Sequence, residues 1–289
     1  MRQLGIIGCP LGHSISPAIH QAALDHRSIG LKYHRWDMPE SQLAQFMTLL
    51  RNRDFLGVNV TVPHKISVMP YLDEIDQWAN RAGAVNTILN RDNKLYGYNT
   101  DGLGFLRSLK EEGRFDPCGK KVLIIGAGGA ARAVVIALAD QGVSEMIIAN
   151  RTIEKCRSLV QIARLSKVDA KEMTLEKQAL ALIARDKALI VNCTIMGMKH
   201  SSLEEETPLL ADDIPSDALV YDLVYNPTET PLLKQARIAR ARPLSGLGML
   251  VYQGAASFEI WTGIEAPAEV MYTAARNALS AIDVRGKDE

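Results

Sequence analysis

Residues 121–152 read KVLIIGAGGAARAVVIALADQGVSEMIIANRT, and this stretch decides the fold class. Val122 to Ile125 is a short apolar run typical of a buried strand, and Met146 to Ala149 is a second run of the same kind. Between them, the Ala-rich segment from Ala130 to Asp140 is typical of a helix, and Gly142 marks its end. Strand, helix and strand in this order predict one parallel βαβ unit.

The turn between the first strand and the helix matches the GxGxx(G/A) fingerprint of dinucleotide-binding proteins at Gly126, Gly128 and Ala131. The first glycine permits a tight turn, the second lets a pyrophosphate approach the backbone, and the third small residue lets helix and strand pack closely. The amides and the dipole of the helix N-terminus then favour an anion. The alternative is a glycine-rich turn without a ligand, but the flanking strands and helix favour a nicotinamide dinucleotide.

The residues after the second strand indicate which dinucleotide binds. NAD enzymes usually carry an acidic residue there for the ribose 2′-hydroxyl, whereas this chain has Asn150, Arg151 and Thr152, followed by Lys155. A guanidinium suits a 2′-phosphate because it forms charge-assisted, bidentate hydrogen bonds. We therefore predict NADP, the alternative being solvated charges at the start of a surface helix.

The first hundred residues alternate in the same way and predict a second α/β region. The expected strands are 4–8, 32–36 and 57–62, the expected helices are 17–24 (closed by Gly30), 40–50 and 102–112, and 84–89 with 95–98 form a hairpin. Further on, 188–193 and 219–223 read as buried strands, and 248–257 and 266–282 as helices. The best domain break is near Leu103, and a second is placed near Gly246.

Three loops of the first region carry polar side chains at strand ends. Ser14 and Ser16, next to His13, open the first helix, where hydroxyls and helix amides suit a carboxylate, although Ser16 could simply be an N-cap. Lys65 follows the third strand, where most lysines are solvated. Asp101 precedes a helix, where an Asp is more often a cap than a catalyst.

Composition narrows the classes of partner and compartment. Thirty-three Lys and Arg balance 33 Asp and Glu, so no global field attracts nucleic acid or an anionic membrane. The four cysteines, widely separated, form no zinc or disulfide pattern, so we expect no metal and a reducing compartment. No apolar run approaches the roughly 20 residues of a membrane helix, and no leader pattern opens the chain, so we expect a cytoplasmic protein.

Taken together, the motifs point to one family. HSISP, NVTVPHK, GAVNT, NTDG, GAGGAAR, NRT, YNP and GLGMLVYQ occur in the order found in shikimate dehydrogenases. The chain strongly resembles that family from about Gly5 to Gln253. Ser245 stands where the family more often has Asp or Asn, and Gln77 stands where an acidic residue is frequent. These departures concern the fine tuning of substrate binding and leave the reaction unchanged.

The resemblance implies a fold and a set of site residues. The fold is an N-terminal α/β substrate-binding domain (1–102, with the helices of 246–289 packing back on it) and a Rossmann NADP-binding domain (103–245). Lys65 and Asp101 would form the catalytic pair, with Ser14, Ser16, Thr61, Asn86, Tyr225 and Gln253 around the substrate. The cofactor would be held by Gly126, Ala127, Gly128, Gly129 and Ala130 at the pyrophosphate, Asn150, Arg151, Thr152 and Lys155 at the adenosine phosphate, and Thr194, Leu223 and Gly246 at the nicotinamide.

The reaction that the resemblance implies is reversible, NADPH-dependent reduction of 3-dehydroshikimate to shikimate, a step of chorismate and aromatic amino-acid biosynthesis. Two alternatives stay open: a quinate/shikimate dehydrogenase using NAD or NADP, and a nucleotide-sensing homologue without turnover. We expect a small-molecule substrate and neither a nucleic-acid nor a membrane partner. A homodimer is compatible with the sequence, which does not determine the oligomeric state.

Overall fold

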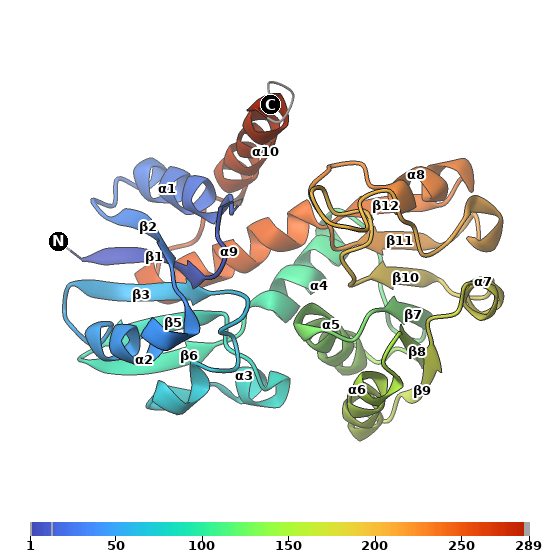
Figure 1. Ribbon diagram of the computed structural model, residues 1–289, viewed down its shortest axis with the longest axis horizontal. Coiled ribbons are helices and arrows are strands. Elements are labelled where there is room, and N and C mark those ends of the chain that lie inside the picture. Colours follow the sequence, from blue (N-terminus) through green and yellow to red (C-terminus); the bar gives the residue numbers. More distant parts are fainter. Residues whose placement is uncertain (1, 13, 286–289) are drawn as a thin grey trace. The chain divides into compact units, whose positions relative to one another are not determined.

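The computed structural model describes residues 2–12 and 14–285 (Figure 1). Its contacts divide the chain into two compact units, one made of residues up to Gly104 with those from Val251 onward, the other of Phe105–Leu250. The two divisions fall within helices α4 (Asp101–Glu111) and α9 (Leu247–Thr262). Each unit holds its own six-stranded sheet, so the chain is an α/β protein, as predicted.

The first unit has a mixed sheet in the order β2-β1-β3-β5-β6-β4. Strand β1 pairs in parallel with β2 and β3, as the predicted βαβ alternation requires, and β5 and β6 form the predicted antiparallel hairpin. The strands span Gln3–Gly8 (β1), Lys32–Asp37 (β2), Phe55–Val60 (β3), Glu74–Ile75 (β4), Thr87–Arg91 (β5) and Lys94–Tyr98 (β6). The antiparallel pairing of β3 with β5 places the residues that follow β3 beside those that precede β5.

Helices cover both faces of this sheet. They are α1 (Ser16–His26), α2 (Glu40–Leu49), the 3-10 helix η1 (Met69–Tyr71), α3 (Gln77–Ala82) and α10 (Ala268–Arg285). Phe46 of α2 and Ala79 of α3 pack with Val58 and Ile88 in one buried cluster. Helix α10 packs along α1 (Figure 1), and Trp261 of α9 donates from Nε1 to the Ile88 carbonyl over 2.9 Å. The last helical segments therefore complete the core of the first unit.

The second unit has a parallel sheet in the order β12-β11-β10-β7-β8-β9. The strands span Lys121–Ile125 (β7), Glu145–Asn150 (β8), Asp169–Thr174 (β9), Leu189–Asn192 (β10), Leu219–Asp222 (β11) and Arg242–Ser245 (β12). This is the doubly wound dinucleotide-binding order, in which the chain reverses direction along the sheet between β7 and β10. This strand order confirms the Rossmann prediction. Because ligands bind outside the carboxyl ends of strands at such a switch point, the cofactor site is expected at that edge of the sheet.

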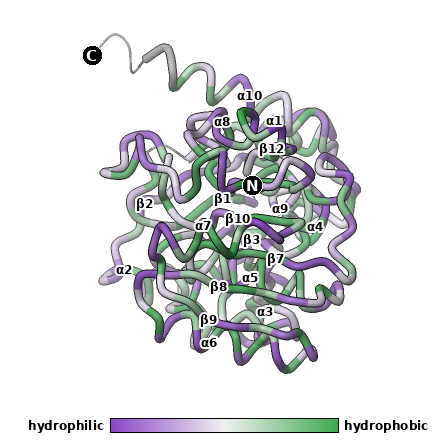
Figure 2. Tube along the Cα trace, turned by 90° about the vertical axis from the view of Figure 1, so that its right-hand side faces the viewer, coloured by the Kyte–Doolittle hydropathy of each residue, from purple (hydrophilic) through white to green (hydrophobic). Residues whose placement is uncertain are grey.

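The helices of the second unit are α5 (Gly129–Asp140), α6 (Ile153–Leu165), α7 (Lys177–Ala184) and α8 (Pro231–Ile238), with the 3-10 helix η2 (Ala211–Asp213). Figure 2 shows β7 and β8 as hydrophobic segments, in keeping with the burial of most of their residues. α7 and α8 contribute Leu180 and Leu232 to the cluster on one face, where they meet Leu123 and Ile190. Strands buried on both faces read as continuous apolar runs, which is why the sequence revealed them.

Several element ends differ from the predicted ones. The first helix ends at His26 and not near Gly30, because Ser28 adopts a left-handed conformation with φ of 54°. The strand expected to reach Val62 ends at Val60, and the His64 amide then bonds back to the Thr61 carbonyl over 2.9 Å. The elements β4, β9 and β12 and the helices α3, α7 and α8 were not predicted. β4, β12, α3, α7 and α8 have eight residues or fewer, too few for a clear periodic pattern.

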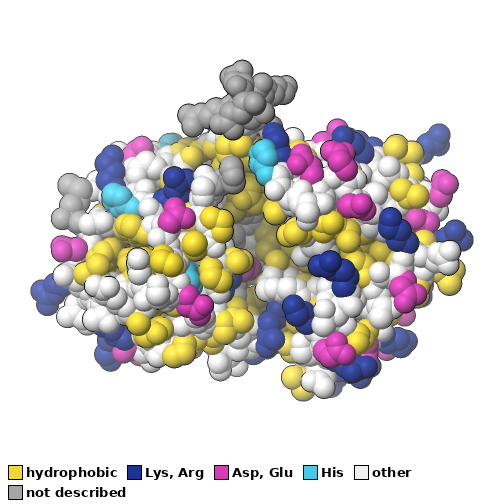
Figure 3. Space-filling view, in the orientation of Figure 1, with side chains coloured by type: hydrophobic (Ala, Val, Ile, Leu, Met, Phe, Trp, Pro, Cys, Tyr) yellow, Lys and Arg dark blue, Asp and Glu magenta, His cyan; other side chains and the backbone are white. Residues whose placement is uncertain are grey.

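Charges of both signs are spread over the face shown in Figure 3, where Lys and Arg alternate with Asp and Glu. This agrees with the formal net charge of +0. Among the residues that the structure describes, no helix is both long and apolar enough to cross a membrane.

Candidate functional site

The first candidate centre lies where the chain leaves β3. After Val60 the segment Thr61–Lys65 turns, with a cis peptide bond between Val62 and Pro63. The buried His64 ring anchors this turn, since its Nε2 lies 2.6 Å from the Met38 carbonyl oxygen. The Lys65 carbonyl accepts from the Val85 amide over 2.8 Å. The His64 contact and the hydrogen bond from Val85 thus hold the backbone at Lys65 close to the start of β5.

Lys65 and Asp101 form an ion pair. Nζ of Lys65 lies 2.6 Å from Oδ2 of Asp101, the first residue of α4. The side chains are 24% and 9% exposed, so the carboxylate is nearly buried while the ammonium keeps a side open to solvent. The pair can therefore hold a proton donor where a small ligand can reach it. Because these contacts occupy Asp101, the helix-cap interpretation does not explain its side chain.

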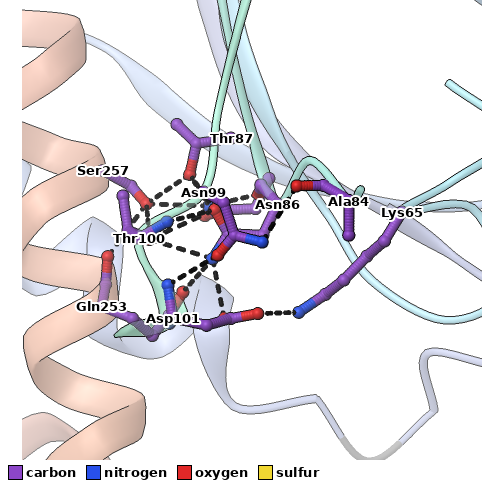
Figure 4. A network of polar contacts seen from close by, with 10 residues as sticks. Lys65, Ala84, Asn86, Thr87, Asn99, Thr100, Asp101, Gln253 and Ser257 are labelled. Carbon is purple, nitrogen blue, oxygen red and sulfur yellow. Dashed lines mark hydrogen bonds and ion pairs between the residues drawn. The ribbon is translucent and has the colours of Figure 1, made fainter. Parts of the chain in front are cut away.

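Asn86 and Gln253 extend this centre (Figure 4). The buried Asn86 amide donates from Nδ2 to Asp101 Oδ1 over 2.8 Å and to Gln253 Oε1 over 3.3 Å. Gln253 comes from α9, and Asn86 directly precedes β5. Four of the predicted site residues, Lys65, Asn86, Asp101 and Gln253, are thus joined in one hydrogen-bonded cluster.

Ser14, Ser16 and Thr61 lie at the ends of β1 and β3 in the same unit. Ser16 is the first residue of α1, whose N-cap is Ile15, and no side chain caps the helix. The N-cap interpretation of Ser16 is therefore wrong, and its largely buried hydroxyl is not used in capping. Ser14 lines a groove beside Arg35, and its amide bonds to the Leu11 carbonyl over 2.9 Å. His13 lies outside the described residues.

Tyr225 and the cofactor residues belong to the second unit. Burial raises the pKa of the Tyr225 hydroxyl above its usual value, which keeps the phenol protonated as a hydrogen-bond donor. Tyr225 follows β11 by three positions. The role of Tyr225 at the substrate stays a prediction.

The glycine turn after β7 has room for an anion. Gly126 has a φ of +107°, and a Cβ there would lie 3.0 Å from the Cys193 backbone, so only glycine fits. At Gly128 and Gly129, by contrast, a Cβ would meet nothing within 4 Å. Gly128 is the N-cap of α5 and supplies no side chain to its first amides. An open space above uncapped helix amides fits a pyrophosphate.

A pocket beside this turn collects most of the predicted cofactor residues. Its lining includes Gly126, Ala127, Gly128, Asn150, Arg151, Thr152, Lys155 and Thr194. Asn150 Nδ2 donates to the Thr152 carbonyl over 3.0 Å, which shapes the turn between β8 and α6, and no side chain caps α6. Arg151 and Lys155 are exposed, so their charges face solvent at the pocket edge. The arrangement fits an adenosine ribose that carries a 2′-phosphate.

Leu223 and Gly246 do not line that pocket but lie against each other. A Cβ at Gly246 would lie 2.1 Å from the Leu223 carbonyl oxygen, so the two backbones approach closely. Sequence reasoning missed five lining residues: Leu175, Cys193, Ile195, Met196 and Leu203. Cys193 ends the predicted strand 188–193, and Ile195 and Met196 follow it, so the rule that ligands bind at strand carboxyl ends could have identified all three.

A buried carboxylate stabilises the rim of the pocket at Thr194. Asp222, at the end of β11, accepts from Asn192 Nδ2 over 2.9 Å, from Thr230 Oγ1 over 2.6 Å and from the Val224 amide over 3.1 Å. Asn192 Oδ1 in turn accepts from the Thr194 amide over 3.0 Å and from its hydroxyl over 2.7 Å. Burial raises the pKa of the Asp222 carboxyl to about 6, against these hydrogen bonds, which lower it.

Comparison with known proteins identifies relatives along most of the chain. Three family models match it: "Shikimate dehydrogenase substrate binding domain" over residues 6–88, "Shikimate / quinate 5-dehydrogenase" over 110–199, and "Shikimate 5'-dehydrogenase C-terminal domain" over 246–276. A shikimate dehydrogenase (NADP(+)) of Methanopyrus kandleri is 46% identical over 270 residues, covering 93% of this chain and 92% of the relative.

Solved structures also resemble the chain over most of its length. Shikimate 5-dehydrogenase from Thermus thermophilus in complex with NADP(H) and shikimate is 37% identical, with a TM-score of 0.85 over 96% of this chain and 100% of that one. Quinate dehydrogenase from Corynebacterium glutamicum in complex with NAD is 29% identical, with a TM-score of 0.86 over 94% and 98%. Both sister activities thus occur on this fold.

Proposed function

The chain belongs to the shikimate dehydrogenase family, and we propose that it catalyses the reversible, NADPH-dependent reduction of 3-dehydroshikimate to shikimate in chorismate and aromatic amino-acid biosynthesis. The observation that carries this proposal is the 2.6 Å pair of Lys65 and Asp101, joined to Asn86 and Gln253. A homologue that only senses nucleotides has no need of such a pair. Consumption of NADPH with 3-dehydroshikimate, followed by absorbance, tests the proposal, and absence of turnover would leave the sensing alternative.

Lys65 is the proton donor of the reaction. NADPH held by the cofactor residues would supply the hydride to the ring ketone, and the ketone oxygen would then carry negative charge. An ammonium next to that oxygen stabilises the charge and transfers a proton to give the alcohol. Asp101 orients the lysine and the reacting hydroxyl, and Asn86 and Gln253 bind ring hydroxyls. The reverse reaction returns the proton from the shikimate hydroxyl to Lys65.

We assign the remaining residues to binding. Ser14 and Ser16 bind the substrate carboxylate, and Thr61 and Tyr225 complete the substrate site. Residues 126–130 hold the pyrophosphate and Asn150, Arg151, Thr152 and Lys155 the adenosine phosphate. The pocket that Gly126, Ala127 and Gly128 share with those four residues supports this assignment. Thr194, Leu223 and Gly246 border the nicotinamide.

We also propose the domain roles. Residues 1–102 with 246–289 form the substrate domain and 103–245 the NADP domain. Location in the cytoplasm is supported by the four free thiols, which suit a reducing compartment. Formation of a homodimer stays a prediction, which light scattering on purified protein tests.

The second candidate is a quinate/shikimate dehydrogenase, because the chain is similar to a quinate dehydrogenase over nearly its whole length. Quinate carries an extra hydroxyl on the carbon that bears the carboxylate. Two serines that bind this carboxylate closely leave little room for the extra hydroxyl. We therefore expect kcat/KM for shikimate to exceed that for quinate by far. Comparable values for the two compounds would favour the second candidate.

A further inference from the structure

Two buried hydroxyls outside the residues assigned above meet beside the Lys65–Asp101 pair. Oγ1 of Thr87 lies 2.7 Å from Oγ of Ser257, although 170 positions separate them in the chain. Both residues are 0% exposed. Thr87 opens β5 directly after Asn86, and Ser257 lies one helical turn after Gln253 on α9, so each hydroxyl lies next to a residue of the site (Figure 4).

The number of protons fixes the direction of most of the hydrogen bonds around these hydroxyls. The Asn59 side chain accepts from the Tyr33 hydroxyl over 2.7 Å, so its Nδ2 must be the end that points to Ser257 Oγ, 3.1 Å away. Thr87 has one hydroxyl proton, and Asn86 Oδ1, 2.9 Å away, is an acceptor only. Either hydroxyl can be the donor in their 2.7 Å contact, and the Ser257 hydroxyl also donates to the Gln253 carbonyl over 2.9 Å.

The result is a continuous chain of hydrogen bonds that ends on Asp101. Tyr33 donates to Asn59 and Asn59 to Ser257, the hydroxyls of Ser257 and Thr87 contact each other, Thr87 donates to Asn86, and Asn86 donates to Asp101. The last bond ends on a carboxylate, and the bonds of such a chain polarise one another in a buried site. Lys65 donates to the other oxygen of the same carboxylate.

The orientation of the Asn86 side-chain amide determines whether Asn86 can donate to Asp101. Its oxygen and nitrogen ends are almost equal in shape, but only the nitrogen can donate to Asp101 and Gln253. The Thr100 amide, 2.9 Å from Oδ1, holds the oxygen end, and the hydroxyls of Thr87, over 2.9 Å, and of Thr100, over 3.2 Å, are further donors to it. Removing the hydroxyl of Thr87 or of Ser257 weakens the preference for the productive orientation.

We propose that Thr87 and Ser257 are positioning residues, which act through Asn86 to keep its NH2 group on Asp101 in the reactive geometry. This inference rests on the proposed function, since it concerns the same reaction. Helix α9 then has two roles: it places Gln253 in the site, and through Ser257 it supports the orientation of Asn86. It also predicts that neither hydroxyl touches the substrate, so both act only through Asn86.

The test compares Ser257→Ala and Thr87→Val with Thr87→Ser, which keeps the hydroxyl. A lost hydrogen bond of this kind corresponds to roughly three- to tenfold in kcat/KM for shikimate, and Thr87→Ser should restore most of it. Ser108→Ala is the matched control, because Ser108 is a fully buried helical serine in the second unit. All three substitutions outside the second unit should leave the Kd of NADP+, measured by calorimetry, unchanged.

A double-mutant cycle with Asn86→Ala decides whether the effect passes through Asn86. In that background Ser257→Ala should change kcat/KM by less than about twofold, because groups acting as a unit are not additive. An equal loss in both backgrounds, or an equal loss in Ser108→Ala, would overturn the proposal. So would unchanged kcat/KM in folded Ser257→Ala. If Ser257→Ala does not fold, Ser257→Cys, similar in volume and only a weak donor, carries the same comparison.

Measurements on the unmodified protein distinguish a failure of this inference from a failure of the proposed function. If it neither turns over nor binds shikimate in calorimetry, the proposed function fails and the inference fails with it. If it turns over shikimate while the variants match it, only the inference fails.

Discussion

Lys65 Nζ and Asp101 Oδ2 lie 2.6 Å apart, although 36 positions separate the two residues. The contact exists because the turn after β3 is tied to Val85 by a 2.8 Å backbone hydrogen bond, while Asp101 is tied to Asn86, the next residue. Both partners are therefore anchored to the short segment before β5. A pair that is held in this way can act as one catalytic group.

Removing either member of the pair should lower kcat strongly and leave KM much less changed. Lys65→Ala and Asp101→Asn should each cost roughly 10²- to 10⁴-fold in kcat, since general acid catalysis contributes about that much. The double variant should be scarcely slower than the poorer single variant. Steady-state kinetics on protein shown to be folded measures this.

The opposing view makes Asp101 only a helix cap and Lys65 a surface residue. Asn is itself a good cap, so Asp101→Asn would then be nearly silent. Near-normal kcat in either single variant, or fully additive barriers in the double one, would show that the pair is not the catalytic unit.

NADPH should bind more tightly than NADH because Arg151 lines the pocket edge where a 2′-phosphate would lie. Arg151→Ala removes a charge-assisted contact worth about 1.5 to 3 kcal/mol, or roughly 10- to 150-fold in the Kd of NADPH. The Kd of NADH should hardly change, because NADH lacks that phosphate. Arg157→Ala is the control, since Arg157 lies further along α6 and pairs with Glu172. Equal use of NADPH and NADH by the unmodified protein would contradict this prediction.

Asp222 should make the free energy of unfolding fall as pH rises. Burial raises the pKa of this carboxyl from 3.8 to about 6 in the folded protein. Between these values the folded state binds more protons than the unfolded state, so stability decreases by about 1.4 kcal/mol per pH unit, roughly 3 kcal/mol in all. Urea unfolding at several pH values should show this component in the unmodified chain but not in Asp222→Asn. Asp217→Asn, at an exposed position, is the control, and identical slopes in all three proteins would contradict the prediction.

His20 should act in the opposite direction. Its ring stacks on Tyr33 with centroids 4.4 Å apart, and burial lowers the pKa of the imidazole from 6.5 to about 3, against a smaller effect of Asn59. The unfolded state therefore binds more protons between these values, and stability is lost as pH falls below 6.5. The loss approaches about 5 kcal/mol near the lower value. His20→Phe keeps a stacking ring and should remove this acid sensitivity, measured by the same unfolding series.

His26→Gln provides the matched control, since it removes an exposed imidazole at the end of the same helix. If His20→Phe keeps the full acid slope, the slope has another origin.

Much of the architecture could be predicted because it depends on short spacings in the chain. The run 122–125, the helix from Gly129 and the run 146–149 are adjacent in sequence, and strands buried on both faces need continuous apolar residues. The glycine turn and the Asn150–Lys155 segment are likewise local, so their meeting in one pocket follows from a single βαβ unit. Short elements such as α3 were not predicted, because six residues show no clear hydrophobic periodicity.

The sequence by itself determined the two α/β regions and, through the order of its motifs, the family and the residues of the proposed catalytic pair. Only the tertiary structure decided which side chains support that pair and the cofactor pocket. Ser257 reaches Asn59 across 198 positions, and Asp222 reaches Asn192 because β11 and β10 are neighbours in the sheet. Such contacts depend on strand order and helix packing, which bring together residues whose separation in the chain carries no periodic signal.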